Sequence, residues 1–243
     1  MKSIIKRTAA LFLAGAMLTG FSACADKESA SEHNGAHGDE GNLAGDAPSG
    51  DFNQDELPYG ATMTQLLTSI NDDISVSVEY DNRFLSEEEG KLVSNYLYAM
   101  TTGDAELMEQ VFYPPLLDYS SKTAGYSSSK EYIEAANKNL IDSITTHVQE
   151  EVKQFDIDYI MITDCYVSGD PAIEEDLSGM DKMIAEGIGQ EHIDKTDKAT
   201  RKEIYVDFTY TVNGGADSYD YNYGVGHTIH LFIYNIDGKY YIV

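Results

Sequence analysis

The C-terminal segment, residues 203–243, constrains the fold most strongly, because it reads as a strand followed by a tight hairpin. Apolar and polar residues alternate from Glu203 to Val212, the period-two pattern of a strand with one buried face. Asp237-Gly238 then separates two apolar runs, and this dipeptide favours a two-residue type I′ turn. One face of the hairpin then carries Phe232, Tyr234, Tyr241 and Val243, and the other Leu231, Ile233, Tyr240 and Ile242. Both faces are apolar, so something must cover each.

Three helices are predicted between two further strands, at residues 74–80 and 157–167. Ser86 and Ser128 each stand three residues before a glutamate, the capping-box spacing that begins a helix. Between these two helices, Asp104 caps a shorter one, which the Pro-Pro pair after it is expected to end.

An acidic helix between Ile173 and Ile188 is predicted from apolar residues that recur every three or four positions. Helices first and antiparallel strands afterwards indicate an α+β fold. We therefore expect one domain at residues 57–243, in which N-terminal helices pack on a curved antiparallel sheet that ends in the C-terminal hairpin.

The first 23 residues are typical of a bacterial export signal. Lys2, Lys6 and Arg7 precede an uncharged run of 13 residues, which is shorter than the roughly 20 that a membrane span needs. The run ends in Phe-Ser-Ala-Cys24, which resembles a lipobox with phenylalanine where leucine is usual. The sequence thus predicts lipidation of Cys24 and attachment to the extracytoplasmic face of the cell membrane. The alternative is an ordinary signal peptide.

Residues 24–56 are predicted to be an acidic flexible linker. They are rich in Gly, Ser, Ala, Asp and Glu, and nine acids stand against Lys27. Such a segment cannot bury enough apolar surface to fold. His33 and His37, with nearby acids, offer a possible metal site, but two histidines on a flexible chain are a weak ligand set. A solvated linker is the favoured interpretation, with no metal and no cofactor.

The charge balance excludes some classes of partner. The chain carries 16 Lys and Arg against 42 Asp and Glu, a net charge of −26. Removal of the three basic residues of the leader brings the mature chain near −29. Such a field repels nucleic acid and anionic lipid. With Cys24 modified, Cys165 is the only thiol, and its place in an apolar alternation favours an inert buried side chain.

The residues Asn95-Tyr-Leu-Tyr-Ala-Met-Thr-Thr-Gly-Asp104, followed by Glu106, Leu107, Val111 and Phe112, resemble the helix-Gly-Asp-helix opening of the nuclear-transport-factor-2-like superfamily. The long third helix and the terminal hairpin fit its cone-shaped fold, whereas the helix at 173–188 is additional. The resemblance implies a domain that often pairs through its outer sheet face. It is also consistent with a small lipoprotein of a Gram-positive bacterium.

The resemblance brings an enzymatic alternative. Ketosteroid isomerase, an enzyme of this superfamily, uses an aspartate base with a tyrosine and a protonated aspartic acid as oxyanion donors. Aligned on Gly103-Asp104, the tyrosine falls on Tyr96 and the base near Asp118, while no residue takes the third role. On the structural interpretation, Tyr96 is a core residue and Asp118 a loop acid. Asp156, Asp158 and Asp164 lack the spacing of a calcium loop and are interpreted as solvated strand ends.

The sequence therefore predicts a lipid-anchored extracytoplasmic module that binds or scaffolds at the cell surface, with a small ligand or a protein as its partner. An isomerase- or dehydratase-type enzyme that uses Tyr96 is the alternative, and an acid and a tyrosine meeting in an open cavity would favour it. Two alternatives could bury the second apolar face of the hairpin: a second copy of the chain, or the helix at 173–188. The dimer is slightly preferred, because one short helix spans less than a whole sheet.

Overall fold

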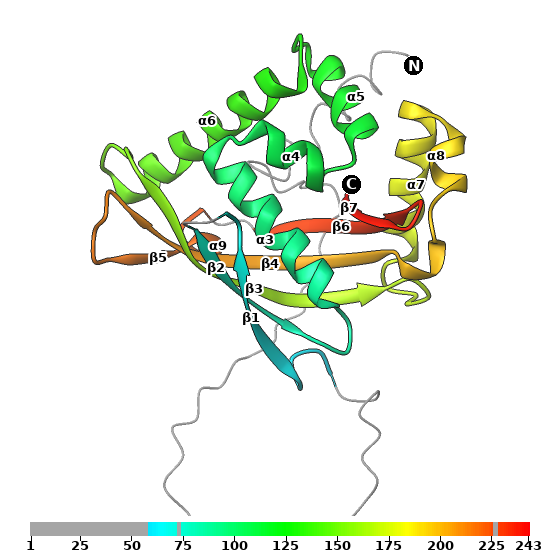
Figure 1. Cartoon of the computed structure of the whole chain (residues 1–243), viewed down its shortest axis with the longest axis horizontal. Helices are drawn as coiled ribbons and strands as arrows, with labels where there is room; N and C mark the ends of the chain where they lie inside the picture. Colours follow the sequence, from blue (N-terminus) through cyan, green and yellow to red (C-terminus); the bar gives the residue numbers. More distant parts are fainter. Residues whose placement is uncertain (1–57, 72–73, 226–227) are drawn as a thin grey trace, which may run out of the picture. The chain divides into compact units, whose positions relative to one another are not determined.

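The computed structural model describes residues 58–71, 74–225 and 228–243, and in these residues seven strands form one curled sheet (Figure 1). The strands are β1 (Met63–Ser69), β2 (Ser75–Asp81), β3 (Phe155–Val167), β4 (Lys202–Val212), β5 (Ser218–Asp220), β6 (Ile229–Ile236) and β7 (Lys239–Ile242). The order across the sheet is β1-β2-β3-β4-β6-β7, with β5 beside β4. The leader, Cys24 and the predicted linker lie outside the described residues.

Helices occupy three stretches of the described chain. Four lie between β2 and β3: α3 (Glu87–Thr102), α4 (Ala105–Val111), α5 (Pro114–Ala124) and α6 (Ser129–Val148). Between β3 and β4 come α7 (Glu174–Ile188), α8 (Gln190–Asp194) and the 3-10 turn η2 (Lys198–Thr200), and α9 (Tyr221–Val225) follows β5. The fold is α+β, as predicted. In the part of the chain that the structure describes, no helix combines the length and apolar character needed to cross a bilayer.

The C-terminal hairpin is confirmed in its register and its turn. Ile236 pairs with Lys239 and Tyr234 with Tyr241. Asp237 and Gly238 adopt φ values of 54° and 84°, the left-handed conformation that a type I′ turn requires at both positions. Local turn chemistry is therefore sufficient to set this register.

The sheet is mixed, which corrects the prediction of a purely antiparallel sheet. β2 and β3 run parallel, with Ser77 opposite Tyr159, and the other neighbouring pairs are antiparallel. The four helices between β2 and β3 form the long crossover that a parallel pair needs. A period-two pattern reports which face of a strand is buried, but it carries no information about strand direction.

Several elements were not predicted, and β1 and α5 show why. Met63–Ser69 pairs with β2 along its whole length. Its sequence, Met-Thr-Gln-Leu-Leu-Thr-Ser, lacks a clean alternation. The prediction that Pro114 and Pro115 only end a helix is also incomplete, because they occupy the first turn of α5. A proline costs little there, since the first amides of a helix have no partner within it.

The predicted helix caps are mostly confirmed. Ser86 and Glu89 form a complete capping box. Gly103 ends α3 in a left-handed conformation with φ 72°, and the Asp104 side chain accepts the Leu107 amide at 3.0 Å. The second box is only half formed. The Ser128 hydroxyl accepts the amide of Glu131, but the Glu131 carboxylate accepts from Ser127 and not from Ser128.

Helix α3 packs against the face of the sheet that we call the inner face, where the side chains of Ile204, Val206 and Phe208 lie. The close approach depends on Gly90, because a Cβ there would lie 2.9 Å from the ring of Tyr80 on β2. α6 packs in turn against α3, and the inner face is closed off from solvent.

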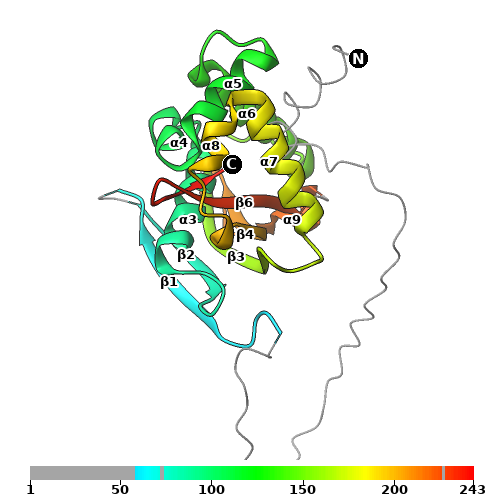
Figure 2. The same cartoon turned by 90° about the vertical axis from the view of Figure 1, so that its right-hand side faces the viewer.

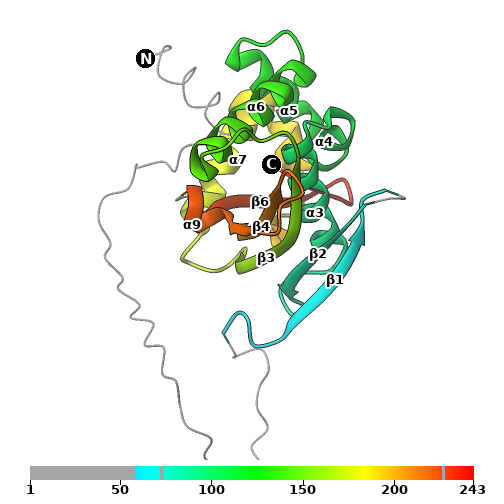
Figure 3. The same cartoon turned by 90° about the vertical axis from the view of Figure 1, so that its left-hand side faces the viewer.

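Helix α7 covers part of the opposite, outer face, so that the hairpin lies between α3 on one side and α7 on the other (Figures 2 and 3). The Tyr234 hydroxyl on β6 donates to Asp181 on α7 at 2.9 Å. Of the eight residues on the two hairpin faces, six are buried within one chain, and Tyr240 and Tyr241 are partly buried. The helix at 173–188 therefore supplies the intramolecular cover, and a dimer is not needed to bury the hairpin.

Candidate functional site

Tyr96 and Asp118, the two residues of the enzymatic alternative, do not share an open pocket. Tyr96 is only 1% exposed and its ring stacks on Phe112 at 6.5 Å between centroids. Burial raises the pKa of Tyr96 well above its usual value. The Asp118 side chain is 54% exposed and pairs with Lys122 at 2.6 Å, one helical turn away. Tyr96 is therefore a core residue, whereas Asp118 is a surface acid on helix α5 and not in a loop, as the structural interpretation had it.

Aromatic side chains fill the space between the inner face and the helices. Phe155 stacks on Tyr210 at 4.9 Å and Phe208 on Tyr221 at 4.6 Å. Tyr96, Tyr210, Tyr221 and Phe208 are among the largest fully buried side chains. A surface hollow of about 410 Å³ lies elsewhere, lined by Glu150, Glu151, Lys153, Gln154 and Asn213. Among the described residues, the ring of Tyr96 is therefore enclosed by packed side chains.

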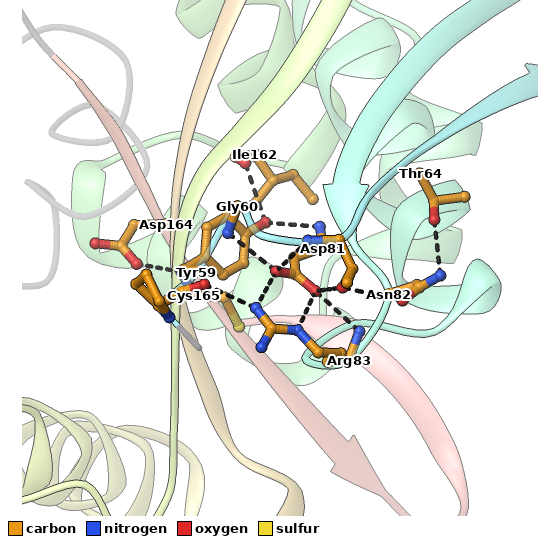
Figure 4. A network of polar contacts seen from close by, with 11 residues as sticks. Tyr59, Gly60, Thr64, Asp81, Asn82, Arg83, Ile162, Asp164 and Cys165 are labelled. Atoms are coloured by element: carbon orange, nitrogen blue, oxygen red, sulfur yellow. Dashed lines mark hydrogen bonds and ion pairs between the residues drawn. The ribbon is translucent and has the colours of Figure 1, made fainter. Parts of the chain in front are cut away.

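A dense polar network surrounds Asp81 at the end of β2 (Figure 4). Its buried carboxylate accepts from Arg83 at 2.6 Å, from the Thr62 hydroxyl at 2.6 Å and from the Gly60 amide at 2.9 Å. The Tyr59 hydroxyl accepts the Asp81 amide at 3.2 Å. The Arg83 guanidinium and these further donors hold the pKa of Asp81 well below its usual value. The network has a structural role, because it ties residues 59–62 to the sheet.

Cys165 lies beside this network and is buried (Figure 4). Burial raises the pKa of its thiol to about 12, so the thiol stays protonated at neutral pH. A nucleophilic cysteine needs the opposite environment, one that favours the thiolate. The structure places Cys165 as an inert core residue, in keeping with its sequence pattern.

A row of three rings crosses the outer face on β3, β4 and β6. Tyr205 stacks on His230 at 4.9 Å with an interplanar angle of 3°, and Tyr166 meets Tyr205 edge to face at 6.1 Å. All three side chains are only partly buried. We call Tyr166, Tyr205 and His230 the outer ring row. It is an accessible aromatic surface next to the part of the sheet that α7 covers.

Carboxylates hold this row in place. Glu203 is 1% exposed, and its Oε1 accepts from the Tyr205 hydroxyl at 2.9 Å and lies 2.5 Å from His230 Nε2. Its Oε2 has no hydrogen-bond partner among the described residues. Burial and the neighbouring Glu203 raise the pKa of Asp176 on α7. The Tyr166 hydroxyl donates to Asp164 at 2.8 Å. Negative charge is therefore concentrated around a single imidazole.

The sequence did not reveal this cluster. Glu203 and Tyr205 stand two apart on one strand, which places them on the same face. Their partner His230, however, is separated from them by the long connection after β4, and only the β4–β6 pairing brings it opposite Tyr205. His227, three residues before His230 in the sequence, lies outside the described residues.

Other polar residues of the described chain do not converge on a metal site. Asp158 accepts from Ser218 at 2.9 Å, and His192 lies 2.6 Å from the Tyr113 hydroxyl. Burial and Asp220 raise the pKa of Asp207, whose carboxylate also accepts two backbone amides. Throughout residues 58–71, 74–225 and 228–243, no three His, Cys, Asp or Glu side chains are placed to hold a metal ion.

Fold and site together define an α+β domain with a filled interior and an acidic, aromatic outer face. No family model, curated protein or solved structure matches the chain.

Proposed function

We propose that the protein is a lipid-anchored extracytoplasmic module that binds a partner through the outer ring row and is not an enzyme. The observation that carries the proposal is the filled interior, in which Tyr96 is sealed from solvent. An enzyme of the predicted kind needs its tyrosine and a carboxylic acid in one reachable cavity. The partly exposed rings of Tyr166, Tyr205 and His230 lie instead on the outer face.

The anchor is proposed from the leader. Its basic start, its short apolar run and Cys24 support lipidation at the cell membrane, in a Gram-positive bacterium. Membership of the nuclear-transport-factor-2-like superfamily remains part of the proposal. The α3–Gly103–Asp104–α4 corner and the terminal hairpin on a curled sheet support it.

The chemistry of the outer ring row favours a positively charged partner. Glu203, Asp176 and Asp164 surround the rings, and the whole chain carries a net charge of −26. Cations bind to aromatic faces, with each such contact contributing about 0.5–1 kcal/mol at an exposed site. The negative charge of the chain also increases the association rate with a basic partner.

Replacing Cys24 with alanine tests the anchor. The Cys24→Ala chain is expected to leave the membrane fraction or to remain unprocessed, because it lacks the cysteine that receives the lipid. The measurement is detergent partitioning of wild type and variant, with Cys165→Ala as the control that keeps Cys24. A wild-type chain that partitions into the aqueous phase contradicts the anchor.

Tyrosine labelling tests the binding surface. On intact cells, Tyr166 and Tyr205 are expected to react less with a tyrosine-modifying reagent than in the purified protein, because a partner covers them. Tyr126, which lies at the corner between α5 and α6, serves as the internal control and is expected to react equally in both samples. Equal labelling of Tyr166 and Tyr205 in both samples contradicts a partner at the outer ring row.

A further inference from the structure

Strand β1 forms an open edge of the sheet. It pairs with β2 on one side, and no described strand pairs with its other side, which lies at the outer margin of the fold (Figure 3). Natural edge strands are usually protected by charge, proline, a bulge, short length or a cover. The seven residues of β1 contain no charged residue and no proline, and their register with β2 is unbroken.

The backbone groups at this edge follow from the register. The amides of Ile70 and Asn82 donate to Ile74 and Thr62, respectively, so the even-numbered residues of β1 bond to β2. In an antiparallel pair the remaining residues point their N–H and C=O groups away from the partner. These outward groups belong to Met63, Gln65, Leu67 and Ser69.

The opposite edge of the sheet is closed. β7 has only four residues and includes Lys239. The corner between α4 and α5 adds to it: Phe112 forms a parallel bridge with Ile242, and the Tyr113 amide donates to the Ile242 carbonyl at 2.9 Å. The fold therefore protects the β7 edge with the α4–α5 corner and with Lys239, whereas the β1 edge has no such protection among the described residues.

Exposed apolar side chains lie beside the bare edge. Of the described residues, only Leu67 and Met161 are large apolar side chains with an exposed surface, at 69% and 37%. Leu67 is opposite Ser77, which is opposite Tyr159, and Met161 is opposite Glu79. Both side chains are therefore on the outer face within three neighbouring strands.

We propose that β1 pairs antiparallel with β1 of a second copy of this chain, about a two-fold axis at Leu67. In this register the odd-numbered residues of one β1 lie opposite the odd-numbered residues of the other. The unpaired amides of each strand then meet the unpaired carbonyls of its partner, and the two Leu67 side chains pack against each other. The assembly is additional to the partner proposed for the outer ring row.

The absence of charge on β1 favours a second copy of the chain, and not a basic peptide, as the partner at the open edge. The chain carries a net charge of −26, but β1 has no acid with which to recognise a basic segment. The same neutrality means that self-pairing places no like charges opposite one another in the ladder. Repulsion between the remaining surfaces opposes the dimer, so added salt is expected to strengthen it.

A pair of matched lysine substitutions tests the interface. The full chain with Cys24→Ser, purified in detergent, is expected to show a dimer in sedimentation at high concentration and high salt. Leu67→Lys is expected to abolish the dimer, because it sets two lysines side by side at the axis. Met161→Lys, two strands away, is expected to preserve it. A monomer under all these conditions overturns the proposal, as does a dimer that Met161→Lys breaks and Leu67→Lys does not.

Amide exchange gives a second readout of the interface, one residue at a time. In the dimer the amides of Gln65, Leu67 and Ser69 are expected to exchange more slowly than in Leu67→Lys, while those of Thr64, Leu66 and Thr68 are protected in both. The alternation identifies pairing at the open edge rather than general burial. If the odd-numbered amides become protected only when an extended peptide is added, the occupant is a peptide and the second-copy proposal is wrong.

Discussion

Arg201→Met is expected to lower the free energy of unfolding by about 3–5 kcal/mol, the usual cost of removing one partner of a buried ion pair. Arg201 is buried, and its guanidinium lies 2.6 Å from Asp181 on α7 and 3.0 Å from the Ser168 hydroxyl. The same aspartate accepts the Tyr234 hydroxyl from β6. The substitution leaves a carboxylate under α7 without its counter-charge, and urea denaturation measures the loss.

Two controls separate the ion pair from general damage to α7. Lys182→Met removes an exposed partner of Glu186 on the same helix and is expected to change stability by no more than about 0.5 kcal/mol. The double variant Arg201→Met with Asp181→Leu removes both charges and is expected to recover much of the loss. If the double variant is as unstable as Arg201→Met alone, packing and not the unpaired charge is responsible.

This ion pair fixes the boundary between the part of the outer face that α7 covers and the outer ring row. Asp181 and Arg201 hold α7 over the hairpin, where the buried Tyr234 donates its hydroxyl to Asp181. The outer ring row lies beside the N-terminal end of α7, where Asp176 in the first turn borders it. A loosened α7 therefore disturbs the row as well as the hairpin, which links the stability of the domain to its proposed binding surface.

Local sequence signals predicted the parts of the fold that local chemistry determines. The Asp237-Gly238 turn, the Ser86 capping box and the alternation of β4 depend on residues within a few positions of one another. The apolar stripe of α7 is also local, and its buried residues Leu177, Met180 and Ile184 are among those predicted. Such features are readable because their partners are adjacent in the chain.

Long-range pairing was not predictable from the same signals. The parallel contact of β2 with β3 and the register of β4 with β6 join segments that are separated by many residues. The outer ring row exists only because of the second register, which brings His230 opposite Tyr205. β1 was missed for another reason: its exposed Leu67 and buried Thr68 invert the expected alternation.

Asp81→Asn is expected to lower the free energy of unfolding at pH 7 by about 3–5 kcal/mol, since it removes one charge of a buried ion pair. The carboxylate is fully buried and accepts from Arg83, Thr62 and Gly60. An amide in its place supplies one acceptor oxygen and turns a nitrogen toward these donors. Denaturation curves of the two proteins at pH 7 measure the loss, with Asp118→Asn, an exposed acid, as the control.

The pH dependence identifies the charge as the cause. The Arg83 guanidinium holds the pKa of Asp81 below its usual value, so the folded state binds the proton less readily than the unfolded chain. The stabilisation is therefore complete above the unfolded pKa of about 3.9 and is lost as the pH falls below it toward the folded pKa. The difference between wild type and Asp81→Asn is expected to shrink between pH 5 and about pH 3. An equal difference at both pH values contradicts the charge of Asp81 as the cause and leaves hydrogen-bond geometry instead.

Because Asp81 also anchors Gly60 and Thr62, directly before β1, the same variant is expected to loosen the strand whose open edge we propose as the dimer interface.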